Sequence, residues 1–245
     1  MNPRRKLEQS ADKVLRRFGI RLKRDRAMRD PIRLFVLKAN ELGAATILDV
    51  GANKGQFASE VFREGWIGDL VSFEPVTETH GRLTQSASAN PHWFVSSPMA
   101  LGATAGTAEI NVAGNLVSSS LLEVAAASTN RNAGTRRVRT ETVAVRRLDD
   151  TIEPSWAAPF ALKVDAEGFD LEVLKGATNT MRNTKVIMVE MCLAPLHEGG
   201  ARFGDLAKFI EDAGFRCISL TENGFADYEQ NEVLAVDGVF VKNEG

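Results

Sequence analysis

The stretch Thr46-Ile47-Leu48-Asp49-Val50-Gly51-Ala52-Asn53-Lys54-Gly55 decides the fold. Residues 47–50 form a short apolar run typical of a buried strand. Residues 57–62 place Phe, Ala, Val and Phe at the spacing of one helix face. A strand that turns through two glycines into a helix is typical of a βαβ unit, so the stretch predicts the start of a parallel α/β sheet.

The chain after this unit continues to alternate between strand and helix patterns. Further strands are predicted at residues 70–73, 93–95, 160–164, 185–189, 216–220 and 238–241, and helices at about 78–87, 171–177 and 203–213. The last two strands are close enough in sequence to pair as an antiparallel edge. Between Gly102 and Asp149, short alternating segments flank a stretch rich in Ser, Ala and Asn, which predicts an inserted β element with a mobile loop. The sequence therefore predicts one α/β domain with seven strands, mostly parallel.

The composition and the charge indicate what kind of protein this is. The 245 residues are 44% hydrophobic and 25% charged, and the formal net charge is −2. Such a balance is normal for a globular domain and gives no global reason to expect a nucleic-acid partner. The chain contains no apolar run long enough to span a bilayer and no signal-peptide pattern, so we expect a cytoplasmic protein. Cys192 and Cys217 lack the spacing of a zinc site or disulfide framework and are expected to be reduced.

The N-terminal segment, Arg4 to Arg33, is rich in Arg and Lys with apolar residues between them. We predict a basic helical extension over residues 1–40, followed by the main domain over residues 41–245. Two interpretations remain open. The segment is a solvated helix at the domain edge, or it makes weak peripheral contact with an anionic membrane, a nucleic acid or an acidic substrate.

The glycine loop after the first strand is a candidate cofactor site. Gly51 and Gly55 let the backbone approach a ligand closely, and the start of the following helix offers unpaired N–H groups. The loop lacks the third glycine of the dinucleotide fingerprint, which disfavours a ligand that contains pyrophosphate. A tight turn without a ligand is the structural alternative.

Glu74 follows the second strand directly, in Ser72-Phe73-Glu74-Pro75. A carboxylate at this position accepts hydrogen bonds from the two hydroxyls of a ribose. Together with the glycine loop, it predicts an adenosine-containing ligand. The alternative for Glu74 alone is a favourable charge near a helix N-terminus.

Several motifs in the same order resemble the FkbM-type methyltransferases. They are Asp49 to Gly55, Phe73-Glu74-Pro75, Met99 to Gly102, Ser118 to Leu121, Arg147 to Asp150, Leu162 to Gly168, Val173 to Ala177 and Val236 to Phe240. The resemblance covers roughly Ile47 to Lys242. It implies a Rossmann-like class I methyltransferase fold, S-adenosylmethionine as methyl donor, and O-methylation of a sugar, a polyketide or another natural product. It does not imply a particular acceptor.

The resemblance also assigns roles to residues on the donor side. Asp49, Gly51, Asn53 and Gly55 would surround the methionine part of the donor, Glu74 would hold the ribose, and Ala100 would border the adenine. The placements of the loop and of Glu74 agree with the interpretation drawn from the residues themselves. The placement of Ala100 rests on the resemblance alone.

Carboxylates are the candidate groups on the acceptor side. Asp165 and Glu167 follow a central strand, and Glu190 follows the next one. A carboxylate near the acceptor assists catalysis by accepting the hydroxyl proton, and three such groups suit Mg²⁺. Similar family members often carry Gln in place of Glu167, which argues against a metal. Asp165 and Glu190 are therefore the predicted catalytic carboxylates, whether a metal is bound stays open, and Glu167 has helix capping as an alternative role.

His197 is the histidine best placed to act as a base, because it follows a core strand at the same edge. Similar sequences favour Tyr there, so the side chain has either a catalytic or a substrate-binding role. His80 and His92 are predicted to be structural or exposed.

The predicted function is transfer of a methyl group from S-adenosylmethionine to a hydroxyl of a sugar, a glycan or another natural product. Two alternatives remain. The first is an NAD-linked oxidoreductase with the same fold. The second is a cofactor-binding module that docks on a nucleic acid or a membrane through the basic segment. The sequence leaves the oligomeric state open, a homo-oligomer included.

Overall fold

The computed structural model describes residues 30–224, 226–227 and 231–243 of the chain. Of the basic extension predicted over residues 1–40, residues 1–29 lie outside the described residues. Helix α2 (Pro31–Glu41) covers its remaining positions, with Pro31 in the first turn and the Asp30 side chain accepting a hydrogen bond from the backbone N–H of Arg33. Within the described part of the chain, no helix is both long and apolar enough to cross a membrane.

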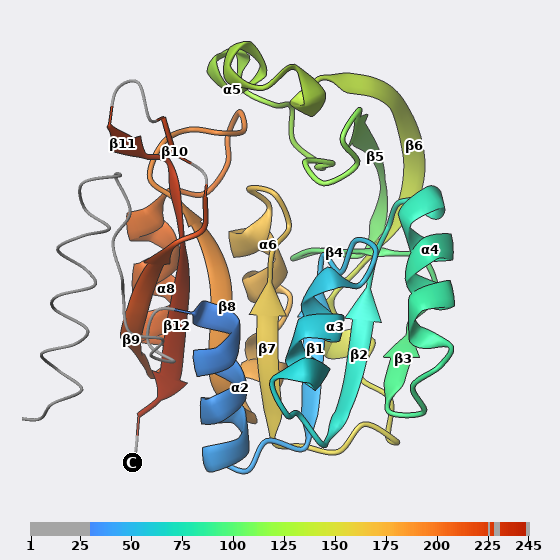
Figure 1. Ribbon diagram of the computed structural model, residues 1–245, viewed down its shortest axis with the longest axis vertical. Helices are drawn as coiled ribbons and strands as arrows, with labels where there is room; N and C mark the ends of the chain where they lie inside the picture. Colours follow the sequence, from blue (N-terminus) through green and yellow to red (C-terminus); the bar gives the residue numbers. More distant parts are fainter. Residues whose placement is uncertain (1–29, 225, 228–230, 244–245) are drawn as a thin grey trace, which may run out of the picture.

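A seven-stranded sheet forms the centre of the molecule (Figure 1). In spatial order its strands are β3 (Trp93–Val95), β2 (Asp69–Phe73), β1 (Thr46–Val50), β7 (Phe160–Val164), β8 (Thr184–Cys192), β12 (Ala235–Lys242) and β9 (Phe215–Glu222). The first five are mutually parallel, and β12 runs antiparallel to both of its neighbours. The predicted seven-stranded, mostly parallel sheet with an antiparallel pair at its C-terminal edge is confirmed.

Helices cover both faces of this sheet, because alternate residues of each strand point to opposite sides. On β1, Leu48 packs into a cluster that includes residues of α6 (Asp170–Lys175), α7 (Thr178–Arg182) and α8 (Phe203–Asp212). Its neighbour Ile47 packs into a second cluster with α2, α3 (Gln56–Arg63) and α4 (Thr77–Ala87). All five residues of β1 and of β7 are buried. Continuous apolar runs of this kind are typical of strands covered on both faces.

A second, three-stranded sheet forms the predicted β insertion. Its order is β4 (Ala100–Leu101), β6 (Arg137–Arg146) and β5 (Gly106–Ala113). The segment between β5 and β6, predicted as a mobile loop, contains a short helix, α5 (Ala126–Arg131), and the 3-10 turn η3 (Ala133–Thr135). A further 3-10 turn, η4 (Leu148–Asp150), leads back to the main sheet.

The insertion stands beyond the carboxyl ends of the parallel strands (Figure 1). The small hairpin of β10 (Ala226–Asp227) and β11 (Glu232–Val233) lies at the same end of the molecule. In open α/β sheets, ligands bind in the crevice outside the carboxyl ends of the strands. A ligand site is therefore expected at the loops after β1, β2, β7 and β8.

Candidate active site

The glycine loop between β1 and α3 is held in a conformation that only glycine adopts easily. Gly51 has a φ of +73°, and a Cβ atom placed on it would lie 1.8 Å from the backbone oxygen of Asp165. Gly55 has a φ of +88°, and its Cβ would lie 2.5 Å from the ring of Trp93. The two glycines are thus required by close packing inside the protein, a reason the sequence did not indicate.

Asp49 supports this loop from behind. Its side chain is fully buried, with Oδ2 accepting a hydrogen bond from Ser72 at 3.0 Å and Oδ1 lying 3.2 Å from Nζ of Lys163. The same Nζ donates to the backbone oxygens of Val50 and Gly51. Burial raises the pKa of Asp49, and Lys163 partly offsets this effect. Burial lowers the pKa of Lys163, but Asp49 and other facing acid groups outweigh it and raise that pKa above its ordinary value.

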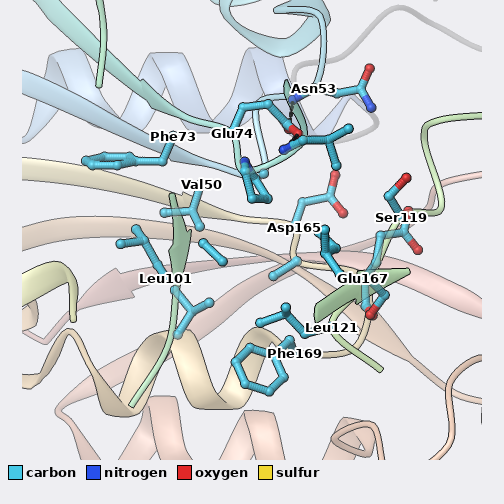
Figure 2. A pocket seen from close by; sticks show the side chains of 18 of the residues that line it. Val50, Asn53, Phe73, Glu74, Leu101, Ser119, Leu121, Asp165, Glu167 and Phe169 are labelled. Atoms are coloured by element: carbon cyan, nitrogen blue, oxygen red, sulfur yellow. Dashed lines mark hydrogen bonds between the residues drawn. The ribbon is translucent and has the colours of Figure 1, made fainter. Parts of the chain in front are cut away.

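Glu74 lies beside the same loop, after the end of β2. Its Oε1 accepts hydrogen bonds from the backbone N–H of Val76 at 2.9 Å and from the Thr79 hydroxyl at 2.7 Å. Its Oε2 accepts from the backbone N–H of Asn53 at 2.9 Å, as Figure 2 shows. Asn53 itself has a φ of +48°. Burial raises the pKa of Glu74, and these hydrogen bonds partly offset the increase.

A cavity of about 690 Å³, here called the inner pocket, opens between the main sheet and the insertion. Its lining includes Gly51, Asn53, Glu74, Ala100, Leu101, Asp165 and Glu167 (Figure 2). Four of the predicted donor-side residues, Gly51, Asn53, Glu74 and Ala100, therefore meet around one cavity. Asp49 and Gly55 are not among the lining residues, and they shape the loop from outside the cavity.

The insertion closes one side of the inner pocket. Leu116, Ser119 and Ser120 belong to its lining. The Asn53 amide donates to the backbone oxygen of Leu116 at 3.2 Å, and the Ser120 hydroxyl donates to the backbone oxygen of Glu167 at 2.7 Å. The motif Ser118 to Leu121 carried part of the sequence resemblance, and the Ser-rich loop was expected over the acceptor side, whereas Ser119, Ser120 and Leu121 line the inner pocket. These two hydrogen bonds connect the insertion to the edge of the main sheet.

A second cavity, here called the outer pocket, has a volume of about 800 Å³. Its polar lining consists of Ser118, Ser128, Asn132, Thr135, Glu167 and His197. Glu167 lines both pockets, and its backbone φ of +50° lies in the left-handed region. Sequence reasoning missed this junction position, because it depends on a turn conformation and on loops distant in sequence.

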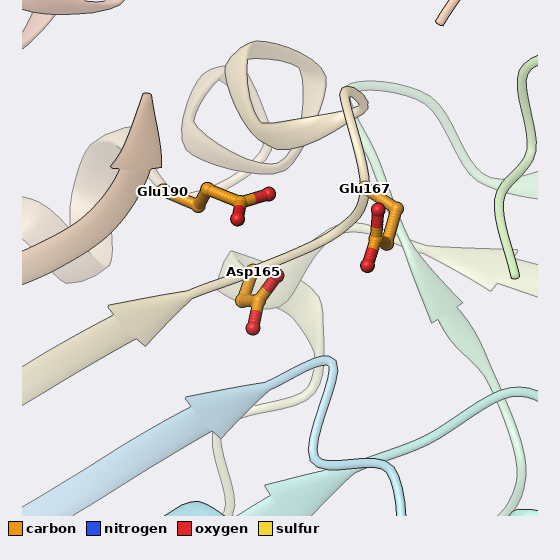
Figure 3. A group of neighbouring side chains, drawn as sticks. All are labelled: Asp165, Glu167 and Glu190. Carbon is orange, nitrogen blue, oxygen red and sulfur yellow. The ribbon is translucent and has the colours of Figure 1, made fainter. Parts of the chain in front are cut away.

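Three carboxylates converge at the ends of β7 and β8 (Figure 3). One oxygen from each of Asp165, Glu167 and Glu190 lies within 4.8 Å of the others, and we call these residues the carboxylate cluster. Burial, and after it the neighbouring acid groups led by Asp165, raises the pKa of Glu167 and of Glu190 well above the ordinary value. Asp170 accepts hydrogen bonds from the backbone N–H groups of Ala166 and Gly168, and burial raises its pKa to about 6.

His197 lies beside the cluster and is 6% exposed. Its Nε2 is 3.8 Å from Oε2 of Glu167, which is beyond hydrogen-bond distance. Neither ring nitrogen has a hydrogen-bond partner among the described residues. Burial lowers the pKa of His197 to about 4. Of the three predicted catalytic residues, Asp165 therefore lines the inner pocket and His197 the outer one, while Oε1 of Glu190 accepts a hydrogen bond from Asn223 at 2.7 Å.

The chain is similar to several known proteins. One relative is the hexuronic acid methyltransferase AglP of Haloferax volcanii, 27% identical over 192 residues, which are 77% of this chain and 70% of that protein. A solved structure of magnesium protoporphyrin IX methyltransferase from Synechocystis PCC 6803 gives a TM-score of 0.49 at 9% identity and covers 99% of this chain and 98% of its own. TehB from Haemophilus influenzae gives a TM-score of 0.47 at 11% identity over 86% of this chain. This chain spans 62% of TehB, less than two thirds of its length.

The family comparison covers the glycine loop, the insertion and the carboxylate cluster. The model of the methyltransferase FkbM domain matches residues 49–217, which are more than half of the 245 residues. The chain therefore belongs to the family of methyltransferase FkbM domains and is an S-adenosylmethionine-dependent methyltransferase.

Proposed function

We propose that the protein transfers a methyl group from S-adenosylmethionine to a hydroxyl of a sugar or glycan. In this proposal the inner pocket holds the donor and the outer pocket holds the acceptor. The observation that carries it is that the two pockets meet at one side chain, Glu167. Two cavities that share a wall allow a donor and an acceptor to approach each other while protein surrounds both.

The residues of the inner pocket fit the donor. The inner pocket is lined by apolar side chains with a few polar groups among them, as small-molecule sites usually are. The Glu74 carboxylate, at the end of β2, is placed to accept hydrogen bonds from ribose hydroxyls, and Phe73, Ala100 and Leu101 offer an apolar surface to a flat ring. When bound, S-adenosylmethionine supplies an electrophilic methyl group on a positively charged sulfur.

The lining of the outer pocket supports a polyhydroxylated acceptor. Its serine, threonine and asparagine side chains both donate and accept hydrogen bonds, as recognition of sugar hydroxyls requires. None of its described lining residues is Phe, Tyr or Trp, and its one aromatic ring is the imidazole of His197. The name of the relative AglP, a hexuronic acid methyltransferase, points to the same class of acceptor.

We assign to His197 the role of accepting the proton of the acceptor hydroxyl. It is buried in the wall of the outer pocket, and both ring nitrogens lack partners among the described residues. During transfer, an oxygen lone pair of the acceptor forms the new bond to the methyl carbon, and the electrons of the carbon–sulfur bond return to sulfur. The hydroxyl proton then passes to His197, which leaves S-adenosylhomocysteine and a methyl ether as products.

Replacing His197 with Gln is expected to lower kcat on the order of 100-fold, because a positioned base contributes about that factor or more. The affinity for S-adenosylhomocysteine should stay within about twofold of the original, since His197 does not line the inner pocket. Turnover is measured by S-adenosylhomocysteine release with whichever of glucuronate, galacturonate and their methyl glycosides is methylated. His92→Gln is the matched control, since His92 is exposed and paired with Asp69. Unchanged turnover in His197→Gln would remove the residue from the mechanism.

Donor identity is tested by calorimetric titration of the full chain with S-adenosylhomocysteine and, separately, with NADH. We expect saturable one-to-one binding of S-adenosylhomocysteine and no saturable heat from NADH. Saturable binding of NADH without binding of S-adenosylhomocysteine would contradict the donor site proposed in the inner pocket. Methylation of at least one sugar in the panel is the expected result for the acceptor. Donor binding without any methylated sugar would contradict the assigned acceptor class.

A further inference from the structure

The carboxylate cluster holds more negative charge than the surrounding protein neutralises. Asp165, Glu167 and Glu190 bring one oxygen each to within 4.8 Å of the others. Among the described residues, the one Lys or Arg paired with the cluster is Lys163, whose Nζ lies 3.6 Å from Oδ2 of Asp165. That Nζ lies closer, at 3.2 Å, to the buried Asp49. The three carboxylates of the cluster therefore have one positively charged side chain beside them, Lys163, and that side chain also pairs with Asp49.

Part of this charge is removed from water. Glu167 is 9% exposed, and Asp170, whose charge also acts on the cluster, is 2% exposed, whereas the Asp165 side chain is 42% exposed. Removing carboxylates from water is costly unless a positive charge or a proton compensates. The cluster therefore requires either protons shared among its oxygens or a cation that the chain itself does not supply.

A second, independent observation favours a ligand at this point. The His197 ring is more than nine-tenths buried, and neither ring nitrogen has a hydrogen-bond partner among the described residues. Its Nε2 faces Glu167 at 3.8 Å, a separation too long for a direct hydrogen bond. Buried polar atoms in proteins are nearly always paired, so an imidazole left open toward a carboxylate indicates a missing bound group.

We propose that Asp165, Glu167 and Glu190 together bind one divalent cation, Mg²⁺ or Mn²⁺, at the junction of the inner and outer pockets. Carboxylate oxygens are the ligands these hard cations prefer. The cluster oxygens lie within 4.8 Å of one another, close to the limit of about 4.2 Å between two ligands of one Mg²⁺, so small side-chain rotations would bring them to coordination distance. The unpartnered His197 ring, whose Nε2 lies 3.8 Å from Oε2 of Glu167, then borders the cation site.

The cation also has a role in transfer, and this half of the inference rests on the proposed function. A cation that binds the acceptor hydroxyl favours loss of its proton and fixes the oxygen in place. Glu167 is positioned to serve this role because it lines both cavities. In this role the three carboxylates would hold the cation, and the cation would hold the acceptor oxygen.

The binding test uses full-length protein freed of metal by a chelator. Mn²⁺ is titrated into the protein while free Mn²⁺ is followed by electron paramagnetic resonance, and Mg²⁺ competition is then measured. We expect one Mn²⁺ per chain, displaced by Mg²⁺. Glu190→Gln should weaken Mn²⁺ binding on the order of 100-fold, while its amide oxygen still accepts from Asn223. Glu198→Gln is the matched control, because Glu198 is exposed and outside the cluster, and it should bind Mn²⁺ like the original protein.

The outcomes separate this inference from the proposed function. Absence of one-site Mn²⁺ binding to folded protein overturns the cation site and leaves shared protons as the state of the cluster. Equal loss of binding in Glu190→Gln and Glu198→Gln overturns the assigned ligands. Methylation that persists unchanged in excess chelator overturns the role in transfer. Failure of the proposed donor site appears separately, as absent S-adenosylhomocysteine binding in protein whose Mn²⁺ titration is normal.

Discussion

Replacing Glu74 with Gln is expected to weaken the binding of S-adenosylhomocysteine on the order of 100-fold, or about 2.7 kcal/mol. The carboxylate accepts three hydrogen bonds from protein donors, two of them backbone N–H groups. A glutamine turns an NH₂ group toward at least one of these donors and offers one acceptor oxygen where the glutamate offers two. The substitution should therefore weaken both the hydrogen bond that holds the loop at Asn53 and the proposed contact with the ribose.

Calorimetry of the purified variant measures this loss, and circular dichroism confirms that the protein remains folded. Glu78→Gln is the matched control, because Glu78 lies in the first turn of α4, is exposed, and pairs with Arg82 and Arg139 at the surface. Exposed ion pairs contribute little, so this variant should bind S-adenosylhomocysteine normally. Equal affinities for Glu74→Gln and the original protein would show that the donor binds elsewhere.

The second large effect is expected from Gly51→Ala. The new methyl group would overlap the backbone oxygen of Asp165, which lies 1.8 Å from the Cβ position, and the residue would keep a φ of +73°. Backbone strain costs about 1 to 2 kcal/mol and overpacking about 1 to 3 kcal/mol, so the free energy of unfolding should fall by about 2 to 5 kcal/mol. The loop must move away from β7, so S-adenosylhomocysteine binding should also be lost.

The variant Gly65→Ala separates the cost of backbone strain from the cost of overpacking. Gly65 also has a positive φ, +90°, but a Cβ atom placed there would meet nothing within 4 Å. Its substitution should therefore cost only the backbone strain, about 1 to 2 kcal/mol, and leave ligand binding unchanged. Urea unfolding midpoints of the two variants make the comparison. If both variants lost the same stability, the close approach of Gly51 to β7 would have no energetic weight.

The main sheet was predictable because its strands carry their signal locally. β1 and β7 are short, mostly apolar segments that are interrupted only by the paired Asp49 and Lys163 and, in β1, begin with Thr46, and the helices after them repeat apolar residues at one-face spacing. The donor side was predictable for a related reason. The loop at Gly51 and the carboxylate of Glu74 each follow a strand directly, and the ends of adjacent parallel strands meet at one edge of the sheet.

The acceptor side depends on contacts between distant segments, and the sequence does not encode these locally. Glu167 reaches the junction of the two pockets because its backbone is left-handed, and because the insertion, through Ser120, meets it from 47 positions away. His197 was predicted at the correct edge, but its open ring nitrogens follow from packing against Gly168 and Glu167. The sequence shows the residue types, but it does not show which buried side chains lack hydrogen-bond partners.

The attachment of the insertion to the main sheet has a consequence for how such an enzyme changes substrate during evolution. The strand ends supply most of the donor's surroundings, whereas Ser118, Ser128, Asn132 and Thr135 of the outer pocket all come from the segment between β5 and β6. Mutations in that segment can alter the acceptor's surroundings and leave Glu74 and the glycine loop untouched. Directed evolution toward a new sugar should therefore begin with libraries confined to Ser118 and residues 124–135, because Ser119 and Ser120 also line the inner pocket. The hydrogen bond from Asn53 to Leu116 should be preserved in such libraries.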